Sequence, residues 1–312
     1  MNMTSSSDAT SSVTVTTGPQ YDAWMYPDAP GALGALRNGN FYSVKAEFMT
    51  VNDDGTLRQI NQDADHPNGY SPSVVQLMND HSRRQYITIS GDMDKTALAM
   101  QNPDTIPTIA DFASKIGFGV ELDWEGYGQW TPEYYQQYKT FLGHLASALH
   151  DKGHTLIVDG PPIYDSASQS WYQWKYEEIS PLVNGVVMMI YDNQYDTGVG
   201  NSIAPRDWSA SCLQWLRDKA GDNGIPGIAA YGYKGAESTG RITVNTSDFI
   251  SDLLGSLLAT RTADGDLTST IGDTFYDYSD QQTVNMRARQ AQAQGFNRIS
   301  VWSLGGNPWP TE

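Results

Sequence analysis

The chain has 312 residues, a formal net charge of −17 and a pI near 4.5, which is long enough for one large α/β domain or for two. This acidity argues against nucleic acid and anionic membrane surfaces as partners, because both attract basic patches. An uncharged substrate or a cationic wall polymer remains compatible with it. No apolar run reaches membrane-spanning length, so we expect no membrane insertion. Cys212 has no second cysteine to pair with, and we interpret it as a small core residue.

The chain begins with a Ser/Thr-rich stretch that has no apolar centre. We interpret residues 1–18 as a disordered leader, which is not a signal peptide as it stands. From residue 19 to residue 312 no shift in composition marks a linker. We therefore predict one catalytic domain over residues 19–312.

Strand-like and helix-like segments alternate through this domain. The strongest predicted helix begins with Thr131 as N-cap and Pro132 at the first position, and it ends before Gly153. A further segment, 237–272, is predicted to be an insertion or an elaborated helix layer. Two more helices are predicted around 208–220 and 280–294, and the predicted strands are 21–26, 41–51, 86–90, 118–125, 155–158, 185–191, 228–233 and 299–304.

Such alternation predicts a parallel sheet with helical crossovers. No Gly-rich phosphate loop follows the first predicted strand, which disfavours an open doubly wound sheet. We therefore predict an α/β fold of the (β/α)₈ TIM barrel type, with at most a small insertion between strands seven and eight.

Three acidic residues, Glu121, Asp123 and Glu125, recur at a period of two in the fourth predicted strand. This is the side-chain period of a strand, so all three point to one face. A buried carboxylate without a partner costs several kcal/mol or takes up a proton, so the row indicates a functional site rather than a solvent-facing edge strand. We expect Glu125 to lie outermost, and the deeper Glu121 to share a proton with Asp123.

Lys45 and Glu47 alternate with apolar residues in the second predicted strand, which places both inside the barrel. We favour a buried ion pair that fills the core, and the alternative is that Glu47 contacts substrate. Asp159, at the end of the fifth strand, is a further inward-facing candidate.

The acidic row resembles the signature D-G-x-D-x-D-x-E of glycoside hydrolase family 18, which lies at the end of the fourth barrel strand. Gly119, Asp123 and Glu125 match it, whereas Phe118 replaces the leading Asp and Glu121 replaces the first Asp of the internal pair. Other motifs of the family recur in the same order, and the resemblance covers residues 21–309. They are the second strand with its D-G-x-L turn (44–57), the S-x-G-G run (Thr88 to Gly91), the M-x-Y-D motif (Met189, Tyr191, Asp192) and the tryptophan of strand eight (Trp302).

The resemblance implies a retaining, substrate-assisted mechanism, in which the 2-acetamido oxygen of the substrate is the nucleophile. Glu125 would be the general acid, and Asp123 would hold the acetamido N–H, with Glu121 behind it. Tyr191 would donate to the acetamido oxygen, and Trp302 would form the floor of the sugar site. The other candidate substrate-binding residues are Met189, Asp192, Tyr26, Thr88, Glu47, Tyr127, Trp130 and Tyr233, among which the aromatic rings suit stacking on sugar faces.

The mechanism requires an N-acetyl group at the cleaved sugar, as in chitin, peptidoglycan glycan strands and the chitobiose core of N-glycans. The segments I-S-V-W-S-L-G-G-N-P-W and I-A-A-Y-G-Y-K-G resemble bacterial spore-cortex and cell-wall members more than secreted chitinases. We therefore expect N-acetylglucosaminidase action on peptidoglycan. The alternatives are a chitinase or an endo-β-N-acetylglucosaminidase, and, from another class, a non-catalytic chitinase-like lectin.

No cofactor is expected for such a reaction. The five histidines, at positions 66, 81, 144, 150 and 154, show no metal-ligand spacing apart from the last two, which flank Gly153. We interpret them as surface residues and expect no metal. We further expect a monomer that is secreted or associated with the cell wall.

Overall fold

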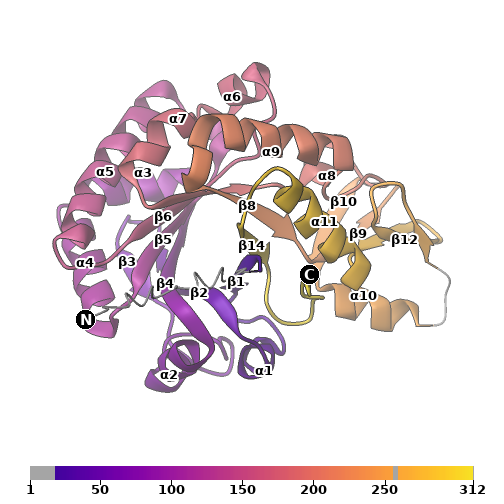
Figure 1. Cartoon of the computed structure of the whole chain (residues 1–312), viewed down its shortest axis with the longest axis horizontal. Coiled ribbons are helices and arrows are strands. Elements are labelled where there is room, and N and C mark those ends of the chain that lie inside the picture. Colours follow the sequence, from indigo (N-terminus) through magenta and orange to yellow (C-terminus); the bar gives the residue numbers. More distant parts are fainter. Residues whose placement is uncertain (1–17, 256–258, 312) are drawn as a thin grey trace, which may run out of the picture.

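The structure is a computed structural model and describes residues 18–255 and 259–311. Apart from Gly18, the predicted leader lies outside the described residues. Figure 1 shows a ring of strands surrounded by helices, with a smaller sheet at one side.

A closed barrel of eight parallel strands forms the centre of the described chain. The first strand pairs with both the second and the last, which closes the ring. The (β/α)₈ barrel predicted from the sequence is therefore confirmed. Its strands are β1 (Gln20–Met25), β2 (Phe41–Val51), β4 (Ser82–Gly91), β5 (Gly119–Trp124), β6 (Leu156–Gly160), β7 (Gly185–Met189), β8 (Gly224–Ala229) and β14 (Arg298–Trp302).

Helices cover the outside of the barrel. The longest, α5, begins as the sequence predicts, because the Thr131 side chain accepts a hydrogen bond from the Tyr134 backbone N–H at 3.1 Å and Pro132 follows at the first position. The helices around the barrel are α1 (Ala32–Asn38), α2 (Pro72–His81), α3 (Met93–Gln101), α4 (Thr105–Ile116), α5 (Pro132–His150), α6 (Ser166–Tyr172), α7 (Tyr176–Ile179), α8 (Asn193–Thr197), α9 (Arg206–Ala220) and α11 (Gln281–Ala293).

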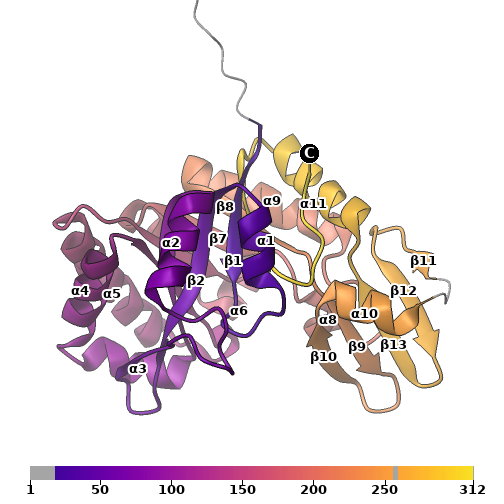
Figure 2. The same cartoon turned by 90° about the horizontal axis from the view of Figure 1, so that it is seen from below.

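The predicted insertion between the seventh and eighth barrel strands is an antiparallel sheet, which Figure 2 shows beside the barrel. The predicted strand 228–233 does not exist as one element, because β8 ends at Ala229 and the first insertion strand begins at Gly232. A short strand β3 (Leu57–Gln59) also pairs with β2. The insertion comprises β9 (Gly232–Ala236), β10 (Arg241–Asn245), α10 (Ser247–Leu254), β11 (Thr260–Arg261), β12 (Leu267–Ile271) and β13 (Thr274–Tyr278).

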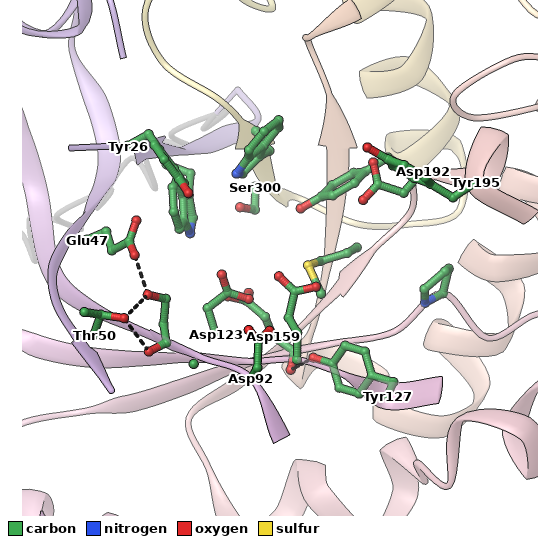
Figure 3. Close-up of a pocket in the computed structure, with 18 of the residues that line it drawn as sticks. Tyr26, Glu47, Thr50, Asp92, Asp123, Tyr127, Asp159, Asp192, Tyr195 and Ser300 are labelled. Atoms are coloured by element: carbon green, nitrogen blue, oxygen red, sulfur yellow. Dashed lines mark hydrogen bonds between the residues drawn. The ribbon is translucent and has the colours of Figure 1, made fainter. Parts of the chain in front are cut away.

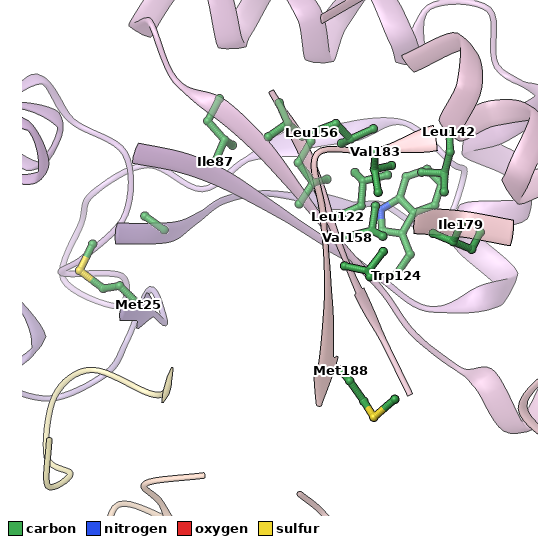
Figure 4. Packing of buried hydrophobic residues seen from close by; sticks show 14 of the residues in the cluster. Met25, Ile87, Leu122, Trp124, Leu142, Leu156, Val158, Ile179, Val183 and Met188 are labelled. Atoms are coloured by element: carbon green, nitrogen blue, oxygen red, sulfur yellow. The ribbon is translucent and has the colours of Figure 1, made fainter. Parts of the chain in front are cut away.

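The main hydrophobic core lies between the barrel strands and the helices, as Figure 4 shows for Leu122, Trp124 and Val158. In β5 the apolar residues turn outward, and the Trp124 ring stacks on Phe141 of α5 with 5.0 Å between ring centroids. Because strand side chains alternate, this packing turns Glu121 and the other acidic residues of β5 toward the barrel interior.

The barrel interior is unusually polar, although branched apolar residues fill most barrels of this type. Lys45 and Glu121 are fully buried and form an ion pair across the interior. The predicted partner of Lys45 was Glu47, and this prediction is wrong. The Glu47 carboxyl lies two residues further along the same strand and accepts a hydrogen bond from Ser90 instead. Lys45 therefore fills the core as expected, but with a partner from another strand.

Candidate active site

A cavity of about 530 Å³ opens at the carboxyl ends of the barrel strands, where TIM barrels carry their active sites. Figure 3 shows acidic and aromatic side chains converging on it from several strands. The sequence-predicted residues that line it are Glu125, Asp123, Tyr191, Trp302, Met189, Asp192, Tyr26, Glu47 and Tyr127, together with the additional candidate Asp159.

Two of the predicted residues lie beneath this cavity rather than in its lining. Glu121 is fully buried, and its carboxylate accepts hydrogen bonds from Lys45 and from the Thr88 hydroxyl. Both carboxylate oxygens thus have a partner other than Asp123, which corrects the expectation that Glu121 shares a proton with Asp123. Thr88 reaches no open space because it points at Glu121 from the neighbouring strand.

Two predicted aromatic residues also lie outside the cavity lining. Trp130 packs among buried rings, with its centroid 5.0 Å from that of Tyr138, and its indole N–H donates to the Glu125 backbone carbonyl at 3.1 Å. Tyr233 belongs to the insertion sheet, where its hydroxyl donates to the Asn201 carbonyl at 2.7 Å. The sequence misplaced both residues because an aromatic residue in a glycine-containing segment looks alike in a core and in a sugar site.

Several lining residues escaped the sequence analysis. Ser90 carried a signal, since it ends the predicted strand 86–90 and strand ends form the active face. The lining residues in loops carried no such signal in the sequence. The missed lining residues are Trp24, Thr50, Val51, Ser90, Gly91, Asp92, Lys95, Pro162, Tyr172, Tyr195, Asp196 and Ser300.

Glu125 directly follows β5, and two backbone features determine its position. Its N–H donates to the Gly91 carbonyl at 2.9 Å, and Gly126 after it adopts a φ of 82°, which turns the chain away from the strand. The side chain opens into the cavity. Glu125 is exposed at the cavity mouth, but the surrounding walls partly desolvate its carboxyl. This desolvation, followed by repulsion from Asp192, raises the pKa of Glu125 to about 7, although a hydrogen bond with Asp123 opposes the shift.

Asp123 lies two residues before Glu125 and deeper in the cavity. Burial raises the pKa of its carboxyl well above the ordinary value, and the charges of Glu125 and Asp159 add to the effect. Its Oδ1 atom is buried and has no hydrogen-bond partner among the described residues. A buried acceptor without a donor costs free energy, so this oxygen is available for an N–H of a ligand.

Trp302, the last residue of β14, contributes an aromatic face to the cavity lining. Its ring plane is inclined by 28° to that of Tyr191, with 6.3 Å between centroids, and the Tyr231 ring meets it edge-on at 5.1 Å. The Tyr231 hydroxyl donates to the Asp192 carboxylate. These contacts fix the orientation of a broad apolar face that suits the apolar face of a sugar ring.

Glu47 approaches the cavity from β2. One carboxyl oxygen accepts a hydrogen bond from the Ser90 hydroxyl, which lies 3.1 Å from the Thr50 hydroxyl (Figure 3). The other oxygen, Oε2, is buried and has no partner among the described residues. Burial raises the pKa of Glu47, while the Ser90 hydrogen bond opposes the increase. The free Oε2 favours the ligand-contact alternative for this residue.

We expect Glu47→Gln to weaken oligosaccharide binding about tenfold, the loss of roughly one hydrogen bond to a carboxyl group, with little change in melting temperature. The glutamine can still accept the Ser90 hydrogen bond, so the folded state keeps its internal contact. Calorimetric titration and thermal unfolding measure the two quantities. Glu237→Gln, an exposed change in the insertion, is the control. A large fall in melting temperature with unchanged affinity would instead assign Glu47 to the core.

Within residues 18–255 and 259–311, no three His, Cys, Asp or Glu side chains are grouped so that they could hold a metal ion. In the same residues no helix combines the length and the apolar character needed to cross a bilayer. Cys212 is buried in α9, as expected of a core residue.

Comparisons with known proteins agree with this architecture. No protein-family model matches the chain. The chain is 26% identical over 204 residues to the uncharacterized glycosylase YvbX of Bacillus subtilis (strain 168), a match that covers 60% of this chain. It spans only 57% of the length of that relative.

Solved structures match over nearly the whole chain. A class V chitinase from Pseudomonas fluorescens Pf-5 superposes with a TM-score of 0.76 at 17% identity, covering 93% of this chain and 96% of that chain. The spore cortex-lytic enzyme SleL of Bacillus cereus also has a TM-score of 0.76 at 17% identity, covering 94% of this chain and 72% of that one.

A third similar structure contains a ligand. It is a glutamate-to-glutamine mutant of the class V chitinase from Nicotiana tobaccum in complex with NAG4, with a TM-score of 0.70 at 16% identity. The match covers 93% of this chain and 95% of that chain. The chain therefore has the chitinase-like fold of glycoside hydrolase family 18, which confirms the resemblance of its motifs at the level of the fold.

Proposed function

We propose that this protein is a retaining glycoside hydrolase that cleaves β-linked glycans containing N-acetylglucosamine, with the acetamido group of the substrate as nucleophile. The observation that carries the proposal is the pairing of Glu125 and Asp123. One carboxyl opens into the cavity and has a pKa of about 7, and the other presents a buried oxygen that lacks a partner. The first suits a proton donor and the second suits an acceptor for the acetamido N–H.

In the first step Glu125 donates its proton to the glycosidic oxygen as the bond from that oxygen to C1 breaks. The acetamido oxygen bonds to C1 and forms an oxazolinium ion, whose positive charge the Asp123 carboxylate stabilises. Tyr191, whose pKa burial raises well above the ordinary value, keeps its proton and donates to the acetamido oxygen. Trp302 forms the floor under the sugar.

In the second step water attacks C1 on the face that the leaving group vacated. The ionised Glu125 takes a proton from this water, and the bond between C1 and the acetamido oxygen breaks. Two displacements on opposite faces retain the configuration at C1. Glu125 thus loses a proton in the first step and regains one in the second.

For the substrate we propose the glycan strands of bacterial peptidoglycan. The similarity to a spore cortex-lytic enzyme and to a Bacillus glycosylase supports this choice over the other N-acetylated polymers. Such a polymer lies outside the cell membrane, so we also propose a secreted or wall-associated protein. Chitin is the second candidate, because chitinases have the same fold.

Mass spectrometry of reaction products tests the proposal. Peptidoglycan glycan strands, chitin oligomers and an N-glycosylated protein are each incubated with the wild type and with Glu125→Gln. We expect fragments with N-acetylated reducing ends from peptidoglycan, and none from the variant. Release from chitin or from the glycoprotein alone would replace the proposed substrate. Binding without release from any of the three would identify a lectin and overturn the hydrolase.

A further inference from the structure

The interior of the barrel below the cavity contains two ion pairs. Near the bottom, the Arg298 guanidinium contacts the Asp22 carboxylate at 2.9 Å between Nε and Oδ2. Above it, Lys45 pairs with Glu121, and neither side chain has any exposed surface. Taking an ion pair out of water is costly, so a pair at this depth needs every remaining polar atom to be satisfied.

Glu121 meets this requirement. Its Oε1 accepts from the Lys45 ammonium and its Oε2 accepts from the Thr88 hydroxyl. Two donors, one of them a cation, hold the carboxylate in its ionised form. Although desolvation opposes the charge on Lys45, the attraction of Glu121 and of other acids outweighs it and raises the lysine pKa.

Asp159 is the next acid in this arrangement. Leu122 and Val158 are paired between β5 and β6, so the residues that follow them, Asp123 and Asp159, lie on neighbouring strands and face the same side. Figure 3 shows the two carboxyl groups projecting into the cavity together. Two neighbouring buried carboxyl groups without a cation of their own cannot both ionise freely, so one of them carries a proton.

Glu121 does not compete for this proton, because its two oxygens already accept from Lys45 and Thr88. A count of charges gives the same result. Asp22 and Glu121 have Arg298 and Lys45 as partners, which leaves Asp159 and Asp123 buried without a cation of their own among the described residues. Burial raises the pKa of Asp159 well above the ordinary value, and the charge of Glu121 adds to the increase, while Lys45 opposes it.

Other groups around the two aspartates do not change this balance. The tyrosines keep their protons near neutrality, because burial raises the pKa of each. The titratable and charged groups around Asp123 and Asp159 are Asp22 on β1, Tyr26 after β1, Lys45 and Glu47 on β2, Glu121 on β5, Glu125 and Tyr127 after β5, Tyr138 on α5, Tyr176 on α7, and Tyr191 and Asp192 after β7, with Arg298 on β14.

We propose that the Lys45–Glu121 ion pair sets the proton balance of the active site, by keeping Glu121 ionised and leaving Asp159 as the proton partner of Asp123. Lys45 and Asp159 are thus positioning residues for the reaction, and this inference rests on the proposed function. The neutral Asp159 allows Asp123 to ionise without a second anion beside it. Glu121, where the family signature has Asp, is long enough to meet Lys45 and is thereby removed from the shared proton.

Infrared spectroscopy tests the location of the proton without any measurement of activity. Protonated and ionised carboxyl groups absorb at different frequencies, so difference spectra against wild type at neutral pH count protonated acids. We expect Asp159→Asn to lose one protonated carboxyl, and Lys45→Met to gain one as Glu121 loses its cation. If the proton lies on Glu121, Asp159→Asn keeps the band and Lys45→Met gains none, which overturns the proposal.

A pH profile of kcat/KM tests the consequence for the reaction. In Glu121→Gln, Lys45 loses its anion and takes Asp159 as a new, ionised partner. An anion next to Asp123 raises the pKa of Asp123. The acidic limb of the kcat/KM profile then moves upward by about one pH unit. The double variant Glu121→Gln with Asp159→Asn removes that anion, and we expect it to restore the wild-type limb. A shift that the double variant does not reverse would assign Glu121 a structural role only and overturn the coupling.

The two experiments also separate this inference from the proposed function. If the wild type cleaves no glycan, the proposed function fails, while the infrared comparison still decides which carboxyl carries the proton. Lys45→Met is the variant most at risk of misfolding, because it leaves a buried carboxyl unpaired. Asp159→Asn is isosteric and leaves the Lys45–Glu121 pair intact, so its spectrum gives a result in either case. Circular dichroism verifies the fold of each variant.

Discussion

Replacing Glu125 by Gln lowers kcat by about 10²–10⁴-fold, the range that general acid catalysis contributes, while the fold and the affinity for glycan stay close to wild type. Glutamine has nearly the same shape and cannot supply the proton that the leaving oxygen needs. The side chain opens into the cavity and packs little of the core, so the substitution costs little stability. Steady-state kinetics, oligosaccharide titration and thermal unfolding measure the three quantities.

The pH dependence of the wild type gives an internal check on this prediction. Glu125 donates only while it is protonated, and its pKa is about 7, so kcat/KM falls as the pH rises through that value. We expect the residual kcat/KM of Glu125→Gln not to show this fall as the pH rises. A folded variant that retains the wild-type rate, or the wild-type limb, would assign the proton donor elsewhere.

Folding stability should respond to the same group. The pKa of Glu125 is raised from 4.5 to about 7 in the folded protein, so between these values the folded state binds a proton that the unfolded state releases. The contribution of Glu125 to the free energy of unfolding therefore decreases as the pH rises through this window. Glu125→Gln removes that contribution, and we expect its stability curve to fall less steeply between pH 4.5 and 7 than that of wild type.

Replacing Asp123 by Asn lowers kcat by about 10²–10³-fold, the size of effect that follows the loss of one preorganised electrostatic contact to a transition state. The amide has no charge to stabilise the oxazolinium ion. Its NH₂ group can also occupy the place of Oδ1, the buried atom that has no donor in the free protein. The loss should appear mainly in kcat, because the positive charge develops only as the reaction proceeds.

The kinetic split distinguishes this role from a general loss of structure. Asp151→Asn, an exposed change after the end of α5, is the control and should leave both constants unchanged. If Asp123→Asn stays within tenfold of wild type in kcat, Asp123 does not stabilise the charged intermediate. A rise in KM alone would make Asp123 a residue that only binds the substrate.

Several features of this protein could be predicted because they depend on neighbours in the chain. The direction of Glu121, Asp123 and Glu125 follows from the two-residue period of a strand. The start of α5 follows from Thr131 and Pro132, whose capping geometry is local. The order of strands and helices predicts the barrel for the same reason, since a parallel sheet requires a crossover between each pair of strands.

Other features could not be predicted, because they join residues that are far apart in the chain. The sequence placed Lys45 inside the barrel but gave no measure of how far its side chain reaches. It meets Glu121, 76 residues away, rather than Glu47 on its own strand. The break after β8 moved Tyr233 out of the site and into the insertion sheet, where backbone pairing with β10 and β13 determines its position.

The sequence by itself thus determined that three acids face one side of one strand, and that a barrel directs that side toward an active face. Only the tertiary structure decided how the protons are distributed among them. Ionisation of a buried acid depends on which charges surround it in space. For Glu121, Asp123 and Asp159 those charges come from strands that meet only when the barrel closes.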